Sequence, residues 1–407
     1  MPALSSALVL NKYILHLFGV KDLEALAENL KDSSLEGYDE NNVSYFHLEL
    51  VKRLFANPLL TAAQLRHYDE NIFAHTERIS EKRSTRISWK YFQYLALLFT
   101  EIYLDQYFTN AAGLRQHLND FRANSKPDKH TDFRAVKPFD EADLTKLAFW
   151  NATGSGKTLL MHLNILQYRH YLRRHGRQRE LNRVIVLTPN EGLSRQHLRE
   201  FAESNLEAEL FDKQTGALFQ GQKIEIIDIN KFRDKSGTKT VAIEAFEGNN
   251  LVLVDEGHRG TGGNEWKRYR ASLAAEGFSF EYSATFGQAV ASQAGQAQKE
   301  LLSEYGKATL FDYSYRYFYQ DGYGKDYQIL NLDEAWDDDN VTQYLVACLL
   351  TFYDQLLVFK DHHAALLPFL VAKPLAIFVG GRVAAVRKLN EFKGDKRQVS
   401  DVVRWSS

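Results

Sequence analysis

Apolar residues in the first part of the chain recur at helical spacing, so residues 1 to about 120 predict an almost wholly helical region. Its clearest element runs from Ile87 to Phe108, a segment rich in aromatic residues and without glycine or proline. We expect one long helix there, with aromatic side chains that pack in a core rather than stack on nucleic-acid bases. The side chains concerned are Trp89, Tyr91, Phe92 and Tyr94.

A polar, charged stretch from Arg122 to Lys137 predicts a linker, and the pattern changes after it. From about residue 141 onward, short apolar segments alternate with segments of helical spacing, which indicates a parallel α/β sheet. The predicted strands are Leu147–Trp150, Val184–Leu187, Ile224–Ile229, Leu251–Val254 and Phe278–Tyr282. Helices are expected at Lys157–Tyr171, Glu191–Glu203 and Trp266–Ala275.

The last third of the chain combines aromatic, acidic and apolar segments. Tyrosines alternate with other residues at 313, 315, 317 and 319, which predicts a strand with one aromatic face. The acidic run at 333–339 predicts a solvated loop that caps the following helix. Segment Val341–Phe359 is apolar but contains Gln343 and Asp354, which favours a buried amphipathic helix over a membrane span. One more strand is expected at Leu375–Val379.

Composition narrows the class of protein only modestly. The 407 residues include 50 basic and 52 acidic side chains, so any nucleic-acid site must be a local patch. The single cysteine, Cys348, excludes an intrachain disulfide framework, and its apolar surroundings predict a buried, inert thiol. The N-terminus lacks a basic start before its apolar part, which argues against a secretory signal. We therefore expect a cytoplasmic protein without a membrane segment.

The segment NATGSGKT, from Asn151 to Thr158, lies between a predicted strand and a predicted helix. In such a loop, glycines let backbone amides surround phosphate oxygens, the lysine reaches the β- and γ-phosphates, and the threonine hydroxyl ligates Mg²⁺. The general pattern has glycine where this chain has Asn151. The segment predicts ATP and Mg²⁺ binding by Thr153, Gly154, Ser155, Gly156, Lys157 and Thr158.

A second segment, LVLVDEGH from Leu251 to His258, is an apolar strand that ends in two carboxylates. In phosphate-loop enzymes the first, here Asp255, holds Mg²⁺, and the second, here Glu256, activates the attacking water. Alone, such a strand end would be a pair of solvated acids. After a phosphate loop, the catalytic interpretation is favoured. His258, which alone would be read as a surface or core residue, would then lie beside the γ-phosphate sensor and could hydrogen-bond a neighbouring element.

Two more strand ends carry short polar segments. Ser283-Ala284-Thr285 follows one predicted strand, and its two hydroxyls could face the metal site. Thr188-Pro189-Asn190 follows another and offers small polar groups to a nucleic-acid backbone, although it also fits an ordinary strand-to-helix turn. The tripeptide SAT has no specificity in isolation.

Taken in order, ATGSGKT, LTPN, DEGH and SAT resemble the first motor domain of superfamily 2 DEAD/DEAH-type helicases. The chain is most similar to the motor (Res) subunit of type III restriction enzymes and related phage-defence helicases, over roughly residues 90 to 400. The similarity is carried by LAFWNATGSGKTLLMH, LTPNEGLSRQHL, LVLVDEGHRG, YSATF and FDYSYRYF. It implies an ATP-driven motor that binds duplex or single-stranded DNA, with a methyltransferase or another defence subunit as partner.

The resemblance also implies an α/β fold in three parts. A helical N-terminal domain with linker would occupy residues 1–140, and a RecA-like P-loop NTPase domain residues 141–330. Residues 331–407 would begin a second RecA-like domain, because KPLAIFVGGR at Lys373–Arg382 resembles its opening strand. The chain ends soon afterwards, without the arginine motif of that domain and without a nuclease motif. We therefore expect a truncated chain that binds ATP weakly and hydrolyses it slowly.

The resemblance implies a role for each motif residue. Lys157 would contact the β- and γ-phosphates, Thr158 and Asp255 would hold Mg²⁺, and Glu256 would act as catalytic base. Coupling of hydrolysis to movement would fall to His258, Ser283 and Thr285, and contact with the nucleic-acid backbone to Thr188, Pro189 and Asn190. No adenine-reading glutamine stands just upstream of the loop, and the distant Gln93 is interpreted as helix surface.

Two alternatives to a DNA-dependent ATPase stay open. An RNA helicase is one, because the preference for DNA rests on family likeness alone. The other is an ATP-gated interaction module, in which nucleotide binding only rearranges the helical region against a partner. The intact Lys157, Asp255 and Glu256 argue against such a module, whereas the missing second domain argues for it.

Overall fold

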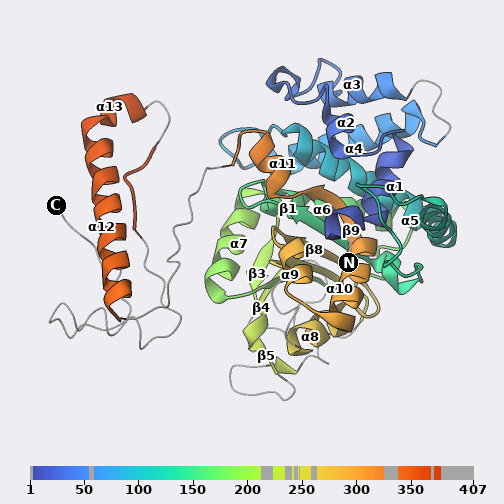
Figure 1. The fold of residues 1–407 in the computed structure, drawn as a ribbon. Coiled ribbons are helices and arrows are strands. Elements are labelled where there is room, and N and C mark those ends of the chain that lie inside the picture. The colour runs from blue at the N-terminus through green and yellow to red at the C-terminus, as the bar shows by residue number, and fades with distance from the viewer. Residues whose placement is uncertain are drawn as a thin grey trace. The chain divides into compact units, whose positions relative to one another are not determined.

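A seven-stranded parallel sheet forms the centre of the computed structural model (Figure 1). The strand order is β3-β4-β2-β7-β8-β1-β9, and every pairing in it is parallel. The strands are β1 (Lys146–Asn151), β2 (Val184–Thr188), β3 (Ala208–Leu210), β4 (Ile224–Asp228), β7 (Leu251–Asp255), β8 (Phe278–Ser283) and β9 (Thr309–Tyr313). All strands predicted between residues 147 and 282 are confirmed, because each is an apolar run buried on both faces.

The structure describes residues 3–54, 59–211, 223–233, 241–242, 246, 248–257, 264–324, 338–367 and 371–376. Two compact units divide the chain, Met1–Lys325 and Asp326–Ser407, and each is described by itself. The first unit contains both the N-terminal helices and the sheet. It also holds a short separate pair of strands, β5 (Phe232–Arg233) and β6 (Val241–Ala242).

The N-terminal helices pack beside the sheet, with α1 and α5 against β9 and α5 against α6 (Figure 1). Their bounds are α1 (Val9–Leu17), α2 (Leu23–Ala27), α3 (Tyr45–Arg53), α4 (Ala62–Ser80) and α5 (Tyr91–Asn124). The long predicted helix is confirmed as α5, although Asn110 kinks it with φ −158° and ψ 81°. Trp89, Tyr91, Phe92 and Tyr94 are buried, which confirms their predicted packing role.

The helices that connect the strands are α6 (Lys157–Arg174), α7 (Glu191–Glu203), α8 (Asn264–Ala274), α9 (Phe286–Ala291) and α10 (Gly295–Ala308). Helices α6, α7 and α8 lie where the apolar spacing predicted them. Because the strands are parallel, the carboxyl ends of β1, β2, β7 and β8 all lie at one edge of the sheet. This edge is where open α/β folds bind ligands.

A buried carboxyl group joins the N-terminal helices to α6. Glu101 on α5 accepts hydrogen bonds from Asn71 Nδ2 (3.0 Å), Gln167 Nε2 (2.9 Å) and Tyr171 OH (2.8 Å). Burial raises the pKa of Glu101 to about 7, against 4.5 for an exposed glutamate, although these donors act in the opposite direction. The fold therefore favours the protonated form of this side chain.

This raised pKa predicts a pH-dependent stability. Between pH 4.5 and about 7 the folded protein keeps a proton on Glu101 that the unfolded chain releases, so the free energy of unfolding falls as pH rises. The slope from this group is at most about 1.4 kcal/mol per pH unit. We expect Glu101→Gln to reduce the decrease in melting temperature between pH 5 and pH 7.5, whereas substitution of the exposed Glu276 by Gln leaves it unchanged. An equal decrease in wild type and Glu101→Gln would contradict this assignment.

The predicted tyrosine strand is wrong. Only Tyr313 lies in a strand, as the last residue of β9, and residues Tyr315–Gln320 form helix α11. Asp312 Oδ1 accepts a hydrogen bond from Ser314 N (3.0 Å) at this strand-to-helix turn, and Ser314 is the N-cap residue of α11. Tyr315 and Tyr319 consequently lie one helical turn apart, with ring centroids separated by 6.0 Å.

The polar stretch 122–137 is more ordered than a linker. Its first residues complete α5, which ends at Asn124, and the buried Phe133 and Val136 anchor the rest. Asn119 on α5 secures the following residues, because it exchanges hydrogen bonds with both backbone groups of Phe139. The polar composition of the stretch conceals these two apolar anchors.

The described part of the second unit consists mainly of α12 (Asp338–Asp361) and the short α13 (His363–Leu366). The helix predicted at 341–359 is confirmed. Its predicted burial is not found within this unit, since Leu350 and Tyr353 are exposed and Cys348 is half-buried. Among the described residues, no helix has the length and apolar content needed to cross a bilayer. Of the acidic run, residues 333–337 lie outside the described residues, whereas Asp338 and Asp339 begin α12. Of the last predicted strand, Leu375 and Ala376 are in no strand, and residues 377–379 lie outside the described residues.

Candidate nucleotide-binding site

The predicted phosphate loop joins the end of β1 to the start of α6. Gly154 and Gly156 have φ angles of +86° and +91°, in the left-handed region that glycine enters without penalty. Gly156 is the N-cap residue of α6, so the backbone amides that follow it start a long helix. Such a helix N-terminus attracts anions through its free N–H groups and its dipole.

Unpaired polar atoms at this loop fit a polar ligand. Both amide atoms of Asn151 and the hydroxyl of Ser155 are buried without a hydrogen-bond partner among the described residues. Buried polar groups in native proteins are paired as a rule, so a ligand or its water shell would supply the missing partners. The residues present therefore fit a phosphate group, including at Asn151, where the general pattern has glycine.

Lys157 is the first residue of α6, and its ammonium nitrogen lies 3.5 Å from the backbone oxygens of Asn151 and Ala152. Burial lowers the pKa of Lys157, and the carboxylates of Glu256 and Asp255 act in the opposite direction. The structure thus brings together the lysine and the acidic pair, which are far apart in the sequence. Thr158 follows on the first turn of α6 and is half-buried.

The acidic pair stands at the end of β7. Asp255 is the last residue of the strand, and its Oδ1 accepts a hydrogen bond from Glu256 N (3.0 Å). Glu256 has φ +56°, a left-handed conformation that costs a non-glycine residue about 1–3 kcal/mol. Gly257 N donates to Tyr282 O on β8 (2.9 Å), and Arg270 Nη1 donates to Gly257 O (2.7 Å). These two bonds hold Glu256 in its strained conformation.

A histidine on α7 contacts the same aspartate. His197 Nε2 lies 2.9 Å from Asp255 Oδ2, and the two side chains are 4% and 14% exposed. Burial favours a higher pKa for Asp255, but the His197 hydrogen bond, the Lys157 charge and the Glu256 amide together hold it below the ordinary value. An ionised Asp255 is the form that binds a divalent cation.

Ser283 and Thr285 lie at the end of β8, the strand between β1 and β7. Ser283 is buried, and its Oγ accepts a hydrogen bond from Thr285 N (3.0 Å). In the pairing of β7 with β8, Asp255 is opposite Tyr282, so Ser283 follows directly beside the acidic pair. His258 lies outside the described residues.

Thr188, Pro189 and Asn190 differ in accessibility. Thr188 ends β2 and is buried, with Oγ1 2.6 Å from Ser194 Oγ, and Pro189 is also buried. Asn190 is exposed and caps α7, because its Oδ1 accepts a hydrogen bond from Leu193 N (3.0 Å). A nucleic-acid contact by side chains of this segment thus depends on Asn190.

Gln93 lies against the phosphate loop, which corrects its interpretation as helix surface. Its Nε2 donates to Ser155 O (2.9 Å), and a Cβ atom on Gly156 would lie 2.4 Å from the same nitrogen. Gln93 Oε1 accepts from Lys90 N (3.0 Å) at the start of α5, so one amide secures both the helix and the loop. No sequence signal reveals this contact, because 62 residues separate the partners.

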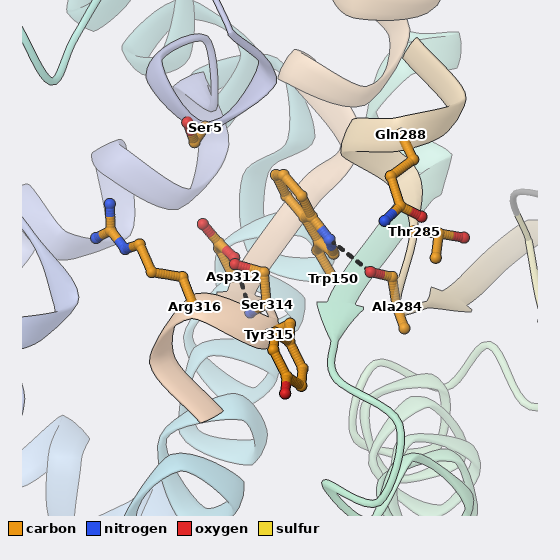
Figure 2. Close-up of a pocket in the computed structure, with 9 residues that line it drawn as sticks. All are labelled: Ser5, Trp150, Ala284, Thr285, Gln288, Asp312, Ser314, Tyr315 and Arg316. Atoms are coloured by element: carbon orange, nitrogen blue, oxygen red, sulfur yellow. Dashed lines mark hydrogen bonds between the residues drawn. The ribbon is translucent and has the colours of Figure 1, made fainter. Parts of the chain in front are cut away.

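A cavity of about 280 Å³ opens beside Thr285, at the ends of β1, β8 and β9 (Figure 2). Trp150 lines it and donates from Nε1 to Ala284 O (3.0 Å). Asp312 and Arg316 line the other side, and burial raises the pKa of Asp312 to about 6. None of the residues predicted to hold phosphate or Mg²⁺ lines this cavity.

Comparison with known families agrees with this geometry. Residues 113–288 match the family model of the type III restriction enzyme, res subunit. The matched span contains the phosphate loop, the acidic pair and the Ser283–Thr285 segment. The match covers less than half of the chain and supports a helicase-type ATPase domain within residues 113–288.

Comparison with individual proteins adds no evidence about function. None of the curated proteins compared with the chain matches it. A solved structure of the Sulfolobus solfataricus SWI2/SNF2 ATPase core in complex with dsDNA is similar at 11% identity and a TM-score of 0.28, over 42% of this chain and 41% of that chain. A likeness of this size carries no argument about function.

Proposed function

From the family domain at residues 113–288, we propose that this chain is the ATP-hydrolysing part of a DNA motor in a restriction or other phage-defence system of the cytoplasm. One observation carries the proposal. Lys157 comes shortly after the end of β1, and the Asp255–Glu256 pair and Ser283 stand at the ends of the adjacent strands β7 and β8. An ammonium group, two carboxylates and a hydroxyl thus lie at the edge of the sheet where open α/β folds bind ligands.

Each of these residues has a role in ATP hydrolysis under the proposal. The amides from Thr153 to Gly156 surround the phosphates, and Lys157 binds their β- and γ-oxygens. Thr158 and Asp255 hold Mg²⁺, which supplies neutralisation of the phosphate charge when bound. Glu256 accepts a proton from the attacking water, and its carboxylate is aimed by the left-handed backbone at its own position.

The coupling residues complete the proposed motor. Ser283 follows directly beside the acidic pair, and Thr285 N donates to its hydroxyl; both respond to the γ-phosphate, together with His258. DNA binds at the exposed Asn190, because a short polar side chain before a helix suits contact with a phosphate backbone. A methyltransferase or another defence subunit would supply target recognition.

The test of the proposal is ATP turnover by the chain with single-stranded DNA, duplex DNA and RNA in turn. We expect DNA to increase turnover, and the apparent DNA affinity to fall about 1,000-fold or more between 50 and 200 mM salt if six or more phosphates are contacted. A larger response to RNA would contradict the choice of DNA. An ATP turnover rate that no nucleic acid changes, but that a protein partner does change, would favour an ATP-gated module.

A single substitution tests the DNA contact. Asn190→Gly removes the side chain but keeps a residue that caps helices with a loss of only a few tenths of a kcal/mol. We expect DNA affinity to fall a few-fold, the equivalent of about 1 kcal/mol for one hydrogen bond. The matched control is Thr61→Gly, at the exposed N-cap of α4, which should leave DNA affinity unchanged. Equal effects of the two substitutions would contradict a contact at Asn190.

A further inference from the structure

We propose that His197 is a positioning residue that orients the Asp255 carboxylate for Mg²⁺ and connects it mechanically to the nucleic-acid loop Thr188–Asn190. The inference deepens the proposed function and rests on it. Three parts of the structure support it: the contact between the two side chains, the attachment of α7 to the loop, and the packing behind the imidazole ring.

The contact leaves Asp255 little freedom to rotate. Its Oδ2 is bonded to His197 Nε2 (2.9 Å), and its Oδ1 to Glu256 N (3.0 Å). An ionised carboxylate only accepts, so the imidazole donates from Nε2. The other ring nitrogen, Nδ1, is buried without a partner among the described residues. His197 thus fixes the plane of the carboxylate while the oxygens keep lone pairs for a cation.

Helix α7 links this histidine to the loop. Asn190 caps the helix at Leu193 N (3.0 Å), and Ser194 Oγ bonds both Thr188 Oγ1 (2.6 Å) and Asn190 O (3.2 Å). His197 comes seven residues after Asn190, two helical turns further along the same side of α7. A displacement of Asn190 would therefore move α7 as a rigid body, together with the imidazole of His197.

The imidazole ring of His197 also packs beside aromatic side chains. His197 and Phe201 lie on the same side of α7, with ring centroids 6.3 Å apart, and His162 on α6 stacks on Phe201 at 4.2 Å. His162 Nδ1 lies 2.8 Å from Ser204 Oγ, so this second buried histidine contacts α7 but not Asp255. Because close packing leaves little room for local adjustment, a shift of α7 would also shift His197 and the Asp255 carboxylate bonded to it.

The expected consequence concerns the metal. Groups that orient a ligand of a metal raise its affinity, and their removal costs about 10- to 100-fold in metal binding or activity. Loss of the His197 bond should thus raise the Mg²⁺ concentration needed for tight nucleotide binding. It should also remove any effect of DNA on that concentration, because the connection to Asn190 runs through the same side chain.

The experiment titrates Mg²⁺ against binding of a fluorescent ATP analogue, by anisotropy, with and without duplex DNA. The variants are His197→Gln, which can still donate to Asp255, His197→Asn, which is too short to reach it, and His47→Gln on α3 as the matched buried control. We expect Asn to raise the half-saturating Mg²⁺ concentration about 10- to 100-fold, and Gln to restore most of the wild-type value. His47→Gln should change it less than about threefold, and DNA should lower it in wild type but not in His197→Asn.

The comparison of Gln with Asn keeps the test decisive, since both are polar amides of the same chemistry. Equal Mg²⁺ requirements for these two variants and the wild type would overturn the inference, as would an unchanged DNA effect in His197→Asn. Failure of the proposed function gives a different result, because wild-type protein would then bind the analogue without any dependence on Mg²⁺.

Discussion

Replacement of Glu256 by glutamine is expected to lower the ATP turnover number about 100- to 10,000-fold, the usual contribution of a general base. The amide cannot take a proton from the attacking water, whereas the neighbouring Asp255 and Lys157 keep their contacts. Glutamine has the same backbone requirements as glutamate, so the left-handed conformation at position 256 costs the same in both proteins. The substitution thus removes the proton acceptor without a change in the loop.

Two measurements check this expectation. Single-turnover hydrolysis of radiolabelled ATP reports the chemical step, and anisotropy of a fluorescent ATP analogue reports binding, which should change less than about threefold because Glu256 is not among the phosphate ligands. The control is Glu276→Gln, an exposed acid beyond the end of α8. Comparable turnover by Glu256→Gln and wild type would remove Glu256 from the role of base and favour a module that only binds ATP.

The second large effect is expected on stability, when Glu281 in a buried ion-pair cluster is replaced. Glu281 on β8 accepts bonds from Lys146 Nζ (2.9 Å) and Tyr305 OH (3.0 Å), and Arg270 Nη1 lies 3.3 Å from its Oε2. The carboxylate and the guanidinium are 4% and 7% exposed. Burial acts to lower the pKa of Arg270, but the Glu281 charge outweighs it and holds the pKa above its ordinary value. A guanidinium cannot be deprotonated in a protein, so Arg270 stays charged after Glu281 is lost.

We therefore expect Glu281→Ala to lower the free energy of unfolding by about 3–5 kcal/mol, the cost of an uncompensated buried charge. Urea denaturation followed by circular dichroism measures the loss. The matched control removes the other partner of Lys146: Glu304 bonds the same nitrogen (2.6 Å) but is 27% exposed, so Glu304→Ala should cost about 0–1 kcal/mol. Similar losses of unfolding free energy in the two variants would show that burial does not determine how much each carboxylate contributes to stability.

The same cluster supports the candidate site. Arg270 also donates to Gly257 O, next to the strained Glu256. A displaced Arg270 would relax this turn, so Glu281→Ala should lower ATP turnover more than its loss of stability alone explains. The acidic pair is therefore positioned by a buried ion pair that no motif contains.

Local patterns were enough to predict most of the secondary structure. The strands were recoverable because parallel strands buried on both faces are short, continuous apolar runs. The loop Asn151–Thr158 and the Asp255–Glu256 pair were predicted at the strand ends where the structure has them, because each is a contiguous segment after an apolar run. The tyrosine segment was mispredicted because alternation over seven residues does not exclude a strand end followed by a helix, as the turn at Ser314 shows.

Side-chain contacts between segments far apart in the chain could not be predicted from the sequence. Gln93 meets Ser155 across 62 residues, and His197 meets Asp255 across 58. No local spacing encodes either pair, since each depends on how α5 and α7 pack against the sheet. His197 lies on a helix whose bounds were predicted correctly, but its direction toward β7 follows only from the pairing of β2 with β7.

The sequence by itself determined the fold class of this protein, a parallel α/β sheet with flanking helices, and predicted a helicase-type ATPase domain, because its motifs are short contiguous segments at strand ends. Only the tertiary structure decided how those segments are held. It turned Thr188 inward, set Gln93 on the phosphate loop and joined His197 to the acidic pair. These features depend on side-chain packing between elements far apart in the chain, and packing is a property of the folded whole rather than of any one segment.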